Sequence, residues 1–134
     1  MSITPTRENP YEKKTRRSPE MHLQAECVKI AWNEFPETRN LLFHVENESG
    51  AADVITGARR RAEGIVRGVS DLILLLPSRD YHALCIEMKT PTGYQSKWQK
   101  EWQKRVEAEG YLYIVCRSTD QFREILKKYL GYDD

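Results

Sequence analysis

The sequence contains no long apolar run, and its first residues lack the apolar core of a secretion signal. Charged residues make up 31% of the 134 positions, and no segment approaches the roughly 20 apolar residues that a transmembrane helix requires. These absences argue against a membrane-spanning or a secreted protein. We expect a single cytoplasmic domain, because the length suits one hydrophobic core and little more.

Cysteine is also scarce. Cys27, Cys85 and Cys116 each stand inside an apolar run, and no two of them have the CxxC spacing of a zinc site. Three widely separated thiols do not form a disulfide framework. We therefore predict three buried free thiols.

An excess of charge of either sign is missing. The 21 Lys and Arg residues nearly balance the 20 Asp and Glu residues, for a net charge of +1. Nucleic-acid contacts would then have to come from local basic clusters. One cluster lies in residues 1–17, which we predict to be a flexible basic arm, and another in a short predicted helix. The candidate DNA-binding residues are Lys13, Lys14, Arg16, Arg17, Arg59, Arg60, Arg61 and Arg67. A solvated tail and a solvated helix face are the ordinary alternatives.

Residues 18–134 have the apolar periodicity of an α/β domain. We expect helices over residues 19–35, 51–63, 95–109 and 118–129, and strands over residues 40–45, 72–76, 83–88 and 111–116. This order predicts a mixed central sheet of about four strands flanked by helices. Trp98 and Trp102 are predicted to anchor the third of the long helices in the core.

The stretch from Gly68 to Lys89 is predicted to be two apolar strands joined by a short turn. Each strand carries an acid, Asp71 at the start of the first and Glu87 near the end of the second. A turn centred near Arg79 would place the two acids opposite each other, with Cβ atoms about 4.5–5.5 Å apart. Alternation along the strand then puts Lys89 on the same face as Glu87. A surface ion pair at a hairpin end is the ordinary alternative.

Two carboxylates at this separation repel each other unless positive charge lies between them. Hard divalent cations such as Mg²⁺ take oxygen ligands and commonly combine one or two carboxylates with water and substrate phosphate. Lys89 would then contact a scissile phosphate, or orient and help deprotonate the attacking water. The pattern therefore predicts a metal-dependent site that acts on phosphate.

The ordered motifs resemble the VRR-NUC (virus-type replication-repair nuclease) branch of the PD-(D/E)xK nuclease superfamily. The similarity covers roughly residues 20–130. The matching positions are Glu26, Gly68-Val69-Ser70-Asp71, Glu87-Met88-Lys89, Gln99, Trp102 and Gly110-Tyr111. The resemblance implies a restriction-endonuclease-like core over residues 18–134 and a nuclease that uses Mg²⁺ or Mn²⁺. Small free-standing members resemble branched-DNA enzymes of phage and bacteria that act as dimers on four-way junctions.

The resemblance also implies a role for each matching residue. Asp71 and Glu87 would be metal ligands and Lys89 the catalytic lysine. Gln99 would position the lysine, the water or the substrate. Glu26 would help to bind or orient the metal through water, although an exposed helix acid is the ordinary alternative.

Further roles follow for three neighbouring positions. The main-chain carbonyl of Met88 would supply another metal oxygen. Asn47 would support the site from the polar turn after the first strand. Ser70 would do so from the position where the superfamily has proline, a change that this branch tolerates.

Two other kinds of protein fit the same sequence. One is a catalytically inert, structure-selective DNA-binding module that kept the fold, which would not need two carboxylates beside a phosphate. The other is a flap, single-strand, RNA or restriction-type nuclease on the same core. We expect a homodimer that cuts four-way junctions, since paired symmetric cuts require two sites.

Overall fold

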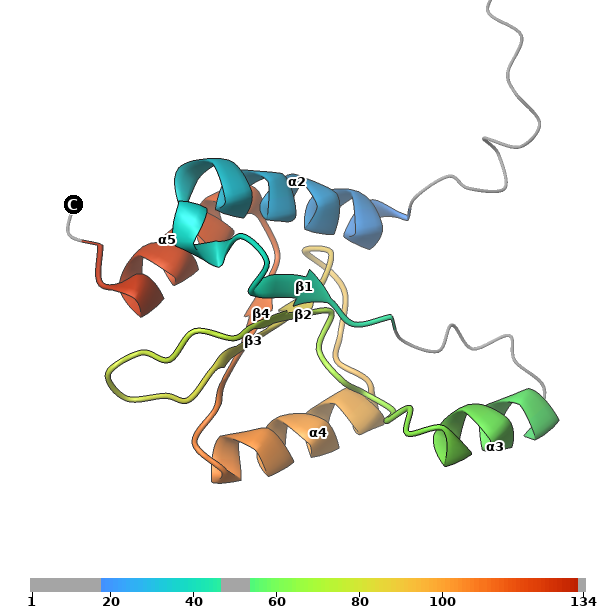
Figure 1. The fold of residues 1–134 in the computed structure, drawn as a ribbon. Helices are drawn as coiled ribbons and strands as arrows, with labels where there is room; N and C mark the ends of the chain where they lie inside the picture. Colours follow the sequence, from blue (N-terminus) through green and yellow to red (C-terminus); the bar gives the residue numbers. More distant parts are fainter. Residues whose placement is uncertain (1–17, 47–53, 133–134) are drawn as a thin grey trace, which may run out of the picture.

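The computed structural model describes residues 18–46 and 54–132, and it confirms the predicted α/β fold class (Figure 1). The elements are α2 (Pro19–Glu34), η1 (Pro36–Thr38), β1 (Leu42–His44), α3 (Val54–Ala62), β2 (Leu72–Leu74), β3 (Leu84–Met88), α4 (Lys97–Ala108), β4 (Leu112–Cys116) and α5 (Thr119–Leu130). They follow the predicted order, and most of them are shorter than predicted by one to a few residues. β2 ends at Leu74 although the apolar run continues, and the next residue, Leu75, is exposed.

The four strands form one mixed sheet in the order β1-β2-β3-β4. β1 pairs with β2, and β2 with β3, in the antiparallel sense, whereas β3 and β4 are parallel. A parallel pair needs a crossover connection, which α4 provides. Figure 1 shows α2 and α5 over one face of the sheet and α4 over the other.

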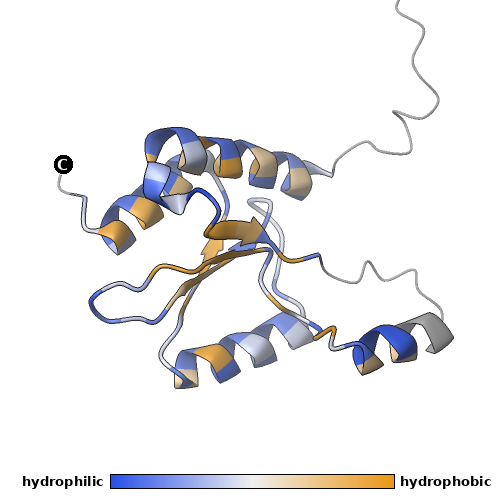
Figure 2. Cartoon of the chain, in the orientation of Figure 1, coloured by the Kyte–Doolittle hydropathy of each residue, from blue (hydrophilic) through white to orange (hydrophobic). Residues whose placement is uncertain are grey.

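The two faces of the sheet differ in chemistry. Side chains that point towards α2 and α5 are apolar and fully buried, and they form the main core with both helices. Figure 2 shows hydrophobic residues, in orange, along the strands. On the strands these core residues are Leu42, Leu72, Leu74, Leu84, Ile86, Met88 and Cys116. The residues between them in β3 and β4 face α4, and they include Glu87 and Tyr113. The polar chemistry of the domain is therefore separated from its main apolar core.

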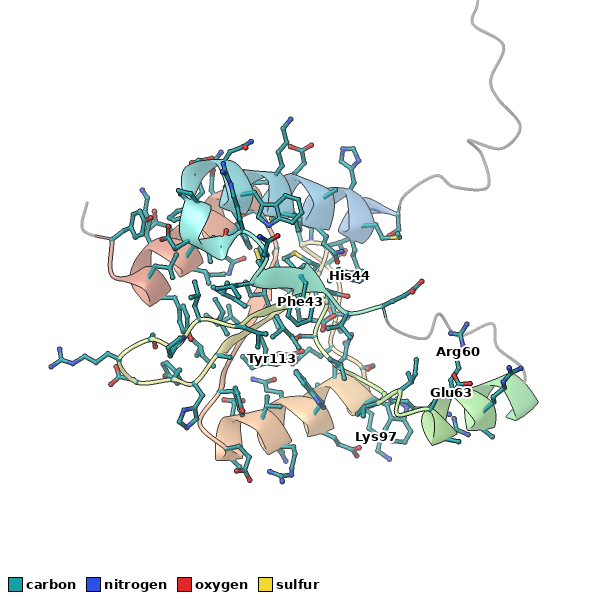
Figure 3. All side chains as sticks on the ribbon, viewed as in Figure 1. Phe43, His44, Arg60, Glu63, Lys97 and Tyr113 are labelled. Atoms are coloured by element: carbon teal, nitrogen blue, oxygen red, sulfur yellow. The ribbon has the colours of Figure 1, made fainter. Side chains whose placement is uncertain are left out.

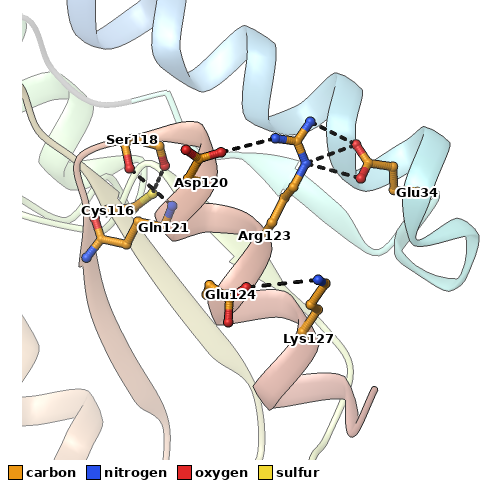
Figure 4. Close-up of polar contacts among 8 residues, drawn as sticks. All are labelled: Glu34, Cys116, Ser118, Asp120, Gln121, Arg123, Glu124 and Lys127. Atoms are coloured by element: carbon orange, nitrogen blue, oxygen red, sulfur yellow. Dashed lines mark hydrogen bonds and ion pairs between the residues drawn. The ribbon is translucent and has the colours of Figure 1, made fainter. Parts of the chain in front are cut away.

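Local signals in the sequence explain where the flanking helices begin. Ser18 caps α2 by accepting the Met21 N–H at 3.2 Å, and Ser118 caps α5 in the same way. Arg123 of α5 binds the Glu34 carboxylate of α2 through two donors, from Nε to Oε1 and from Nη2 to Oε2, each at 3.1 Å (Figure 4). Both side chains are partly exposed, so water screens this ion pair and it contributes little to stability. Burial of the apolar face supplies most of the stability.

The structure corrects the prediction for Trp98 and confirms the prediction for the three cysteines. Trp98 is not a core anchor, because it is 46% exposed. Trp102 is half-buried and makes an edge contact with Tyr113, at 6.0 Å between ring centroids. α4 covers the polar face of the sheet, so no described residue of this helix is fully buried. The three cysteines are buried free thiols, as predicted.

Gly68 fixes the start of α4 against the loop that leads into β2. Its φ angle is +80°, and a Cβ atom at this position would lie 2.3 Å from the Trp98 carbonyl oxygen. Only glycine lets the two backbones come this close. The approach determines where the first turn of α4 lies relative to the strands.

We predict that Gly68→Ala is much more destabilising than Gly64→Ala. Gly64 is a matched control, since its φ is +98° and a Cβ there would meet nothing within 4 Å. Gly64→Ala should cost about 1–2 kcal/mol for the left-handed backbone alone. Gly68→Ala should cost about 1–3 kcal/mol more, because the first turn of α4 must move. Urea unfolding of both variants measures the difference, and equal losses would contradict the close approach.

Candidate active site

The β2–β3 hairpin has the register that the sequence predicted. Leu72 pairs with Ile86, and Leu74 pairs with Leu84. Extending this register by one residue places Asp71 opposite Glu87. The two carboxyl groups are close enough for a hydrogen bond between them.

Asp71 is held by the two strands on either side of it. Its Oδ2 atom accepts the Met88 N–H at 2.7 Å. Its main-chain carbonyl accepts the Val45 N–H at 2.8 Å and lies 2.8 Å from Nδ1 of His44. The N–H and C=O of a strand residue point to the same edge, so the Met88 carbonyl also faces the Asp71 side. Carboxylate and carbonyl oxygens therefore come together at the start of β2.

Glu87 is 2% exposed and has a donor near each of its carboxyl oxygens. Gln99 of α4 donates from Nε2 to Oε1 at 2.9 Å, and the Tyr113 hydroxyl of β4 donates to Oε2 at 3.4 Å. The side-chain Oε1 atom of Gln99 accepts the Ser96 main-chain N–H at 2.8 Å, while the Ser96 hydroxyl accepts the Gln99 main-chain N–H. This capping box turns the NH₂ end of the amide towards Glu87. In this structure Gln99 holds Glu87.

The environment of Glu87 favours its neutral form. Burial raises the pKa of Glu87 to about 9, together with the hydrogen bond to Asp71 and the negative charge of that residue. The positive charge of Lys89 and the hydrogen bond from the Tyr113 hydroxyl both lower the pKa of Glu87, but by less. Burial and the Glu87 charge raise the pKa of Tyr113 as well. The two facing carboxyl groups keep a proton because Glu87 is buried and because their negative charges repel each other. A cation between them would remove this repulsion, so the pair is a candidate cation site.

The donor atoms present suit a hard divalent cation. Asp71 and Glu87 contribute carboxylate oxygens, and the Met88 carbonyl lies on the same edge. Among the described residues, no group of three or more His, Cys, Asp or Glu side chains could hold a metal ion. Mg²⁺ commonly makes up such a small protein set with water and substrate phosphate.

The predicted part of Glu26 in this site is not supported. Its side chain lies on the exposed face of α2, and it does not join Asp71 and Glu87 in a three-acid cluster. The ordinary reading, an exposed helix acid, fits the structure better. A contact through water stays a prediction.

Lys89 and Ser70 flank the two acids. Lys89 is 8% exposed, and its charge acts on Glu87. Ser70 is fully buried, and its hydroxyl donates to the Leu72 carbonyl at 3.0 Å and contacts the Cys85 thiol. Ser70 therefore supports the backbone at the start of β2 and stays away from solvent.

Two residues with clear roles were not found from the sequence. Tyr113 contacts Glu87, and only the parallel register of β3 and β4 brings it there. Arg117 donates from Nη1 to the Thr90 and Gly93 carbonyls at 2.7 and 2.8 Å, and so fixes the loop after Lys89. The Ser96–Gln99 pair did have a sequence signal, because S-x-x-Q ahead of a helix is a capping-box pattern.

The predicted DNA-binding residues that the structure describes are exposed. Arg59, Arg60 and Arg61 lie in the last turn of α3, where Figure 3 labels Arg60. Arg59 Nε is 3.6 Å from Glu63 Oε1. Arg67 lies next to the loop glycine that contacts α4. The remaining candidates, Lys13, Lys14, Arg16, Arg17 and the site residue Asn47, lie outside the described residues.

Comparison with known proteins identifies the family. The family model of the VRR-NUC domain matches residues 6–120. The chain belongs to the VRR-NUC family. VRR-NUC is a nuclease domain family, and DNA is the substrate class that this membership implies. The match begins inside the segment that the sequence predicted to be a separate arm.

A solved structure supports the same fold. A VRR_NUC domain protein superposes with a TM-score of 0.73 at 21% sequence identity, over 89% of this chain and 93% of that chain. No curated protein matches this VRR-NUC chain. Over the described ranges, none of its helices has the length and apolar character needed to cross a membrane.

The raised pKa of Glu87 predicts how stability depends on pH when metal is absent. The unfolded chain releases this proton above the ordinary pKa of 4.5, whereas the folded protein keeps it up to about pH 9. The folded state therefore binds more protons in that window, and rising pH favours unfolding. In EDTA, the free energy of unfolding of the parent should fall through this range more than that of Glu87→Gln.

Denaturant unfolding at several pH values checks this prediction. Glu101→Gln, at an exposed acid of α4, is the matched control and should follow the parent. Parallel pH profiles for the parent and Glu87→Gln would show that Glu87 is not buried as a neutral acid.

Proposed function

We propose that this VRR-NUC domain is a divalent-metal-dependent DNA endonuclease whose site is Asp71, Glu87 and Lys89. The observation that carries the proposal is the buried Glu87 carboxyl, which faces Asp71 and lies beside Lys89. Apolar residues would fill this position better if the role were only structural. An inert DNA-binding module would have no need of two facing acids.

Each residue of the proposed site has a separate role. Asp71, Glu87 and the Met88 carbonyl would hold the cation. When bound, a divalent cation polarises a phosphoryl oxygen and lowers the pKa of water near it. Lys89 places a positive charge beside the acids, where it can contact the scissile phosphate or orient the attacking water.

Gln99 and Tyr113 keep the Glu87 carboxyl in one orientation. Gln99 is itself fixed by the capping box of α4, so its amide cannot turn without breaking two hydrogen bonds. Tyr113 is fixed by Gln95, which donates from Nε2 to the Tyr113 hydroxyl at 3.2 Å. A carboxyl group held in this way needs little reorganisation when a cation binds.

We predict that Asp71→Asn, Glu87→Gln and Lys89→Ala each lower DNA cleavage by roughly 100-fold or more. The first two remove charge that would hold the cation, and the third removes charge beside the phosphate. Cleavage of labelled DNA with Mg²⁺ or Mn²⁺ measures the rates, and Glu101→Gln should cut like the parent. A folded Glu87→Gln that cuts as fast as the parent would mean that the site is misassigned.

We further propose that the preferred substrate is the four-way junction and that the working form is a homodimer. One domain offers one site, while paired cuts across a junction require two sites with matching two-fold symmetry. The exposed arginines of α3 and Arg67 would contact the arms. Exposed aromatic side chains, including Tyr94, which is 89% exposed, offer apolar surface for an interface.

A cleavage panel and a mass measurement test this assignment together. Junction, flap, single-stranded and duplex DNA of matched sequence should be cut fastest as junction. The protein should have the mass of a dimer at micromolar concentration. Junction binding should weaken steeply as salt rises, because phosphate contacts release counterions. A strict monomer that prefers flaps or single strands would favour a structure-specific repair nuclease.

A further inference from the structure

The first turn of α4 presents a large aromatic side chain to solvent beside the proposed site. Trp98 is 46% exposed. It directly precedes Gln99, whose side chain holds Glu87 at 2.9 Å. Packing does not explain the residue, because a half-exposed tryptophan leaves much of its apolar surface in water.

Two cations accompany the Trp98 ring. The Arg67 guanidinium carbon lies 5.1 Å from the ring centroid, and the Lys97 ammonium lies 5.7 Å from it. Neither forms an ion pair with a carboxylate of the described residues. Figure 3 shows Lys97 at the end of α4 that approaches α3. Positive charge that pairs with no carboxylate in the described part of the chain remains available to phosphate.

The backbone holds this group in place before any ligand binds. Arg67 adjoins Gly68, where a Cβ atom would lie 2.3 Å from the Trp98 carbonyl oxygen. Trp98 itself lies inside the capping box that Ser96 and Gln99 form. A preformed surface loses little conformational entropy when a ligand binds.

We propose that Arg67 and Trp98 form a stacking surface for an unpaired nucleobase next to the scissile phosphate. Aromatic rings and guanidinium planes are the surfaces on which unstacked bases bind, and cations beside them attract the phosphates. In an intact duplex the faces of the bases are covered by their neighbours. The surface would therefore select DNA with an unpaired or unstacked nucleotide, such as a branch point. This inference rests on the proposed nuclease function, since it places the base beside that site.

Binding in EDTA tests the inference without cleavage. The probes are fluorescently labelled oligothymidylate, an abasic strand with the same number of phosphates, and a blunt duplex. The proteins are the parent, Trp98→Ala, Trp98→Phe and Trp32→Ala. Trp32 is a matched control because it is also a half-exposed tryptophan, 44% exposed, on α2 across the sheet.

The parent should bind oligothymidylate more tightly than the abasic strand. Trp98→Ala should weaken oligothymidylate binding by roughly 5- to 150-fold, the range for loss of one stacked base. Its binding to the abasic strand and to the duplex should change less than about twofold, because no base is stacked there. Trp98→Phe should keep most of the affinity, and Trp32→Ala should match the parent.

Several outcomes would overturn the inference. Trp98→Ala that binds oligothymidylate like the parent, or weakens all three probes equally, shows no base stacking. A parent that does not distinguish oligothymidylate from the abasic strand leads to the same conclusion. A change of oligomeric mass in Trp98→Ala would place the ring in a subunit interface.

The two proposals fail in different ways. If the parent cuts no DNA but Trp98→Ala still loses affinity for oligothymidylate alone, the nuclease assignment fails and the stacking surface stands. If the parent cuts DNA and Trp98→Ala binds every probe normally, the stacking surface fails and the nuclease stands.

Discussion

The buried carboxyl of Glu87 is the constraint on which the rest of the site depends. Two hydrogen bonds to a charged acid contribute about 1.5–3 kcal/mol each, and the 3.4 Å contact from Tyr113 contributes less. Burying a charge costs several kcal/mol, and Asp71 opposite adds repulsion. Hydrogen bonds alone therefore leave the charged form unfavourable. The two acids therefore retain a proton unless a cation lies between them, and the proposed function places a cation there.

The apolar core and the two acids lie on different faces of the sheet. Its face towards α2 and α5 is a continuous apolar core that contains no acid. The face towards α4 carries Glu87 and Tyr113, and α4 contributes no fully buried residue of its own. A domain of this size can hold a destabilising pair of acids because the opposite face supplies the burial. Replacement of Glu87 by a neutral residue should accordingly disturb the site far more than the fold.

The sequence predicted the hairpin register from the position of the turn, because a turn centred near Arg79 places Asp71 opposite Glu87. Prediction was weaker where the outcome depends on which face a helix covers. Trp98 has the spacing of a core residue, but α4 packs on a polar face, and this cannot be read from periodicity. Tyr113 was missed because its contact with Glu87 arises only from the parallel pairing of β3 and β4. Glu26 matched the family pattern by position, whereas its exposure is set by the rotation of α2.

The first turn of α4 connects these observations. One glutamine amide caps the helix through its oxygen and holds Glu87 through its nitrogen, so the position of the helix and the orientation of the acid are coupled. Gly68, three residues before Asp71, packs closely against the Trp98 backbone in the same turn. A displacement of α4 would therefore move Gln99 relative to both acids together. The positions of Gly68, Gln99, Glu87 and Asp71 are therefore coupled through the first turn of α4.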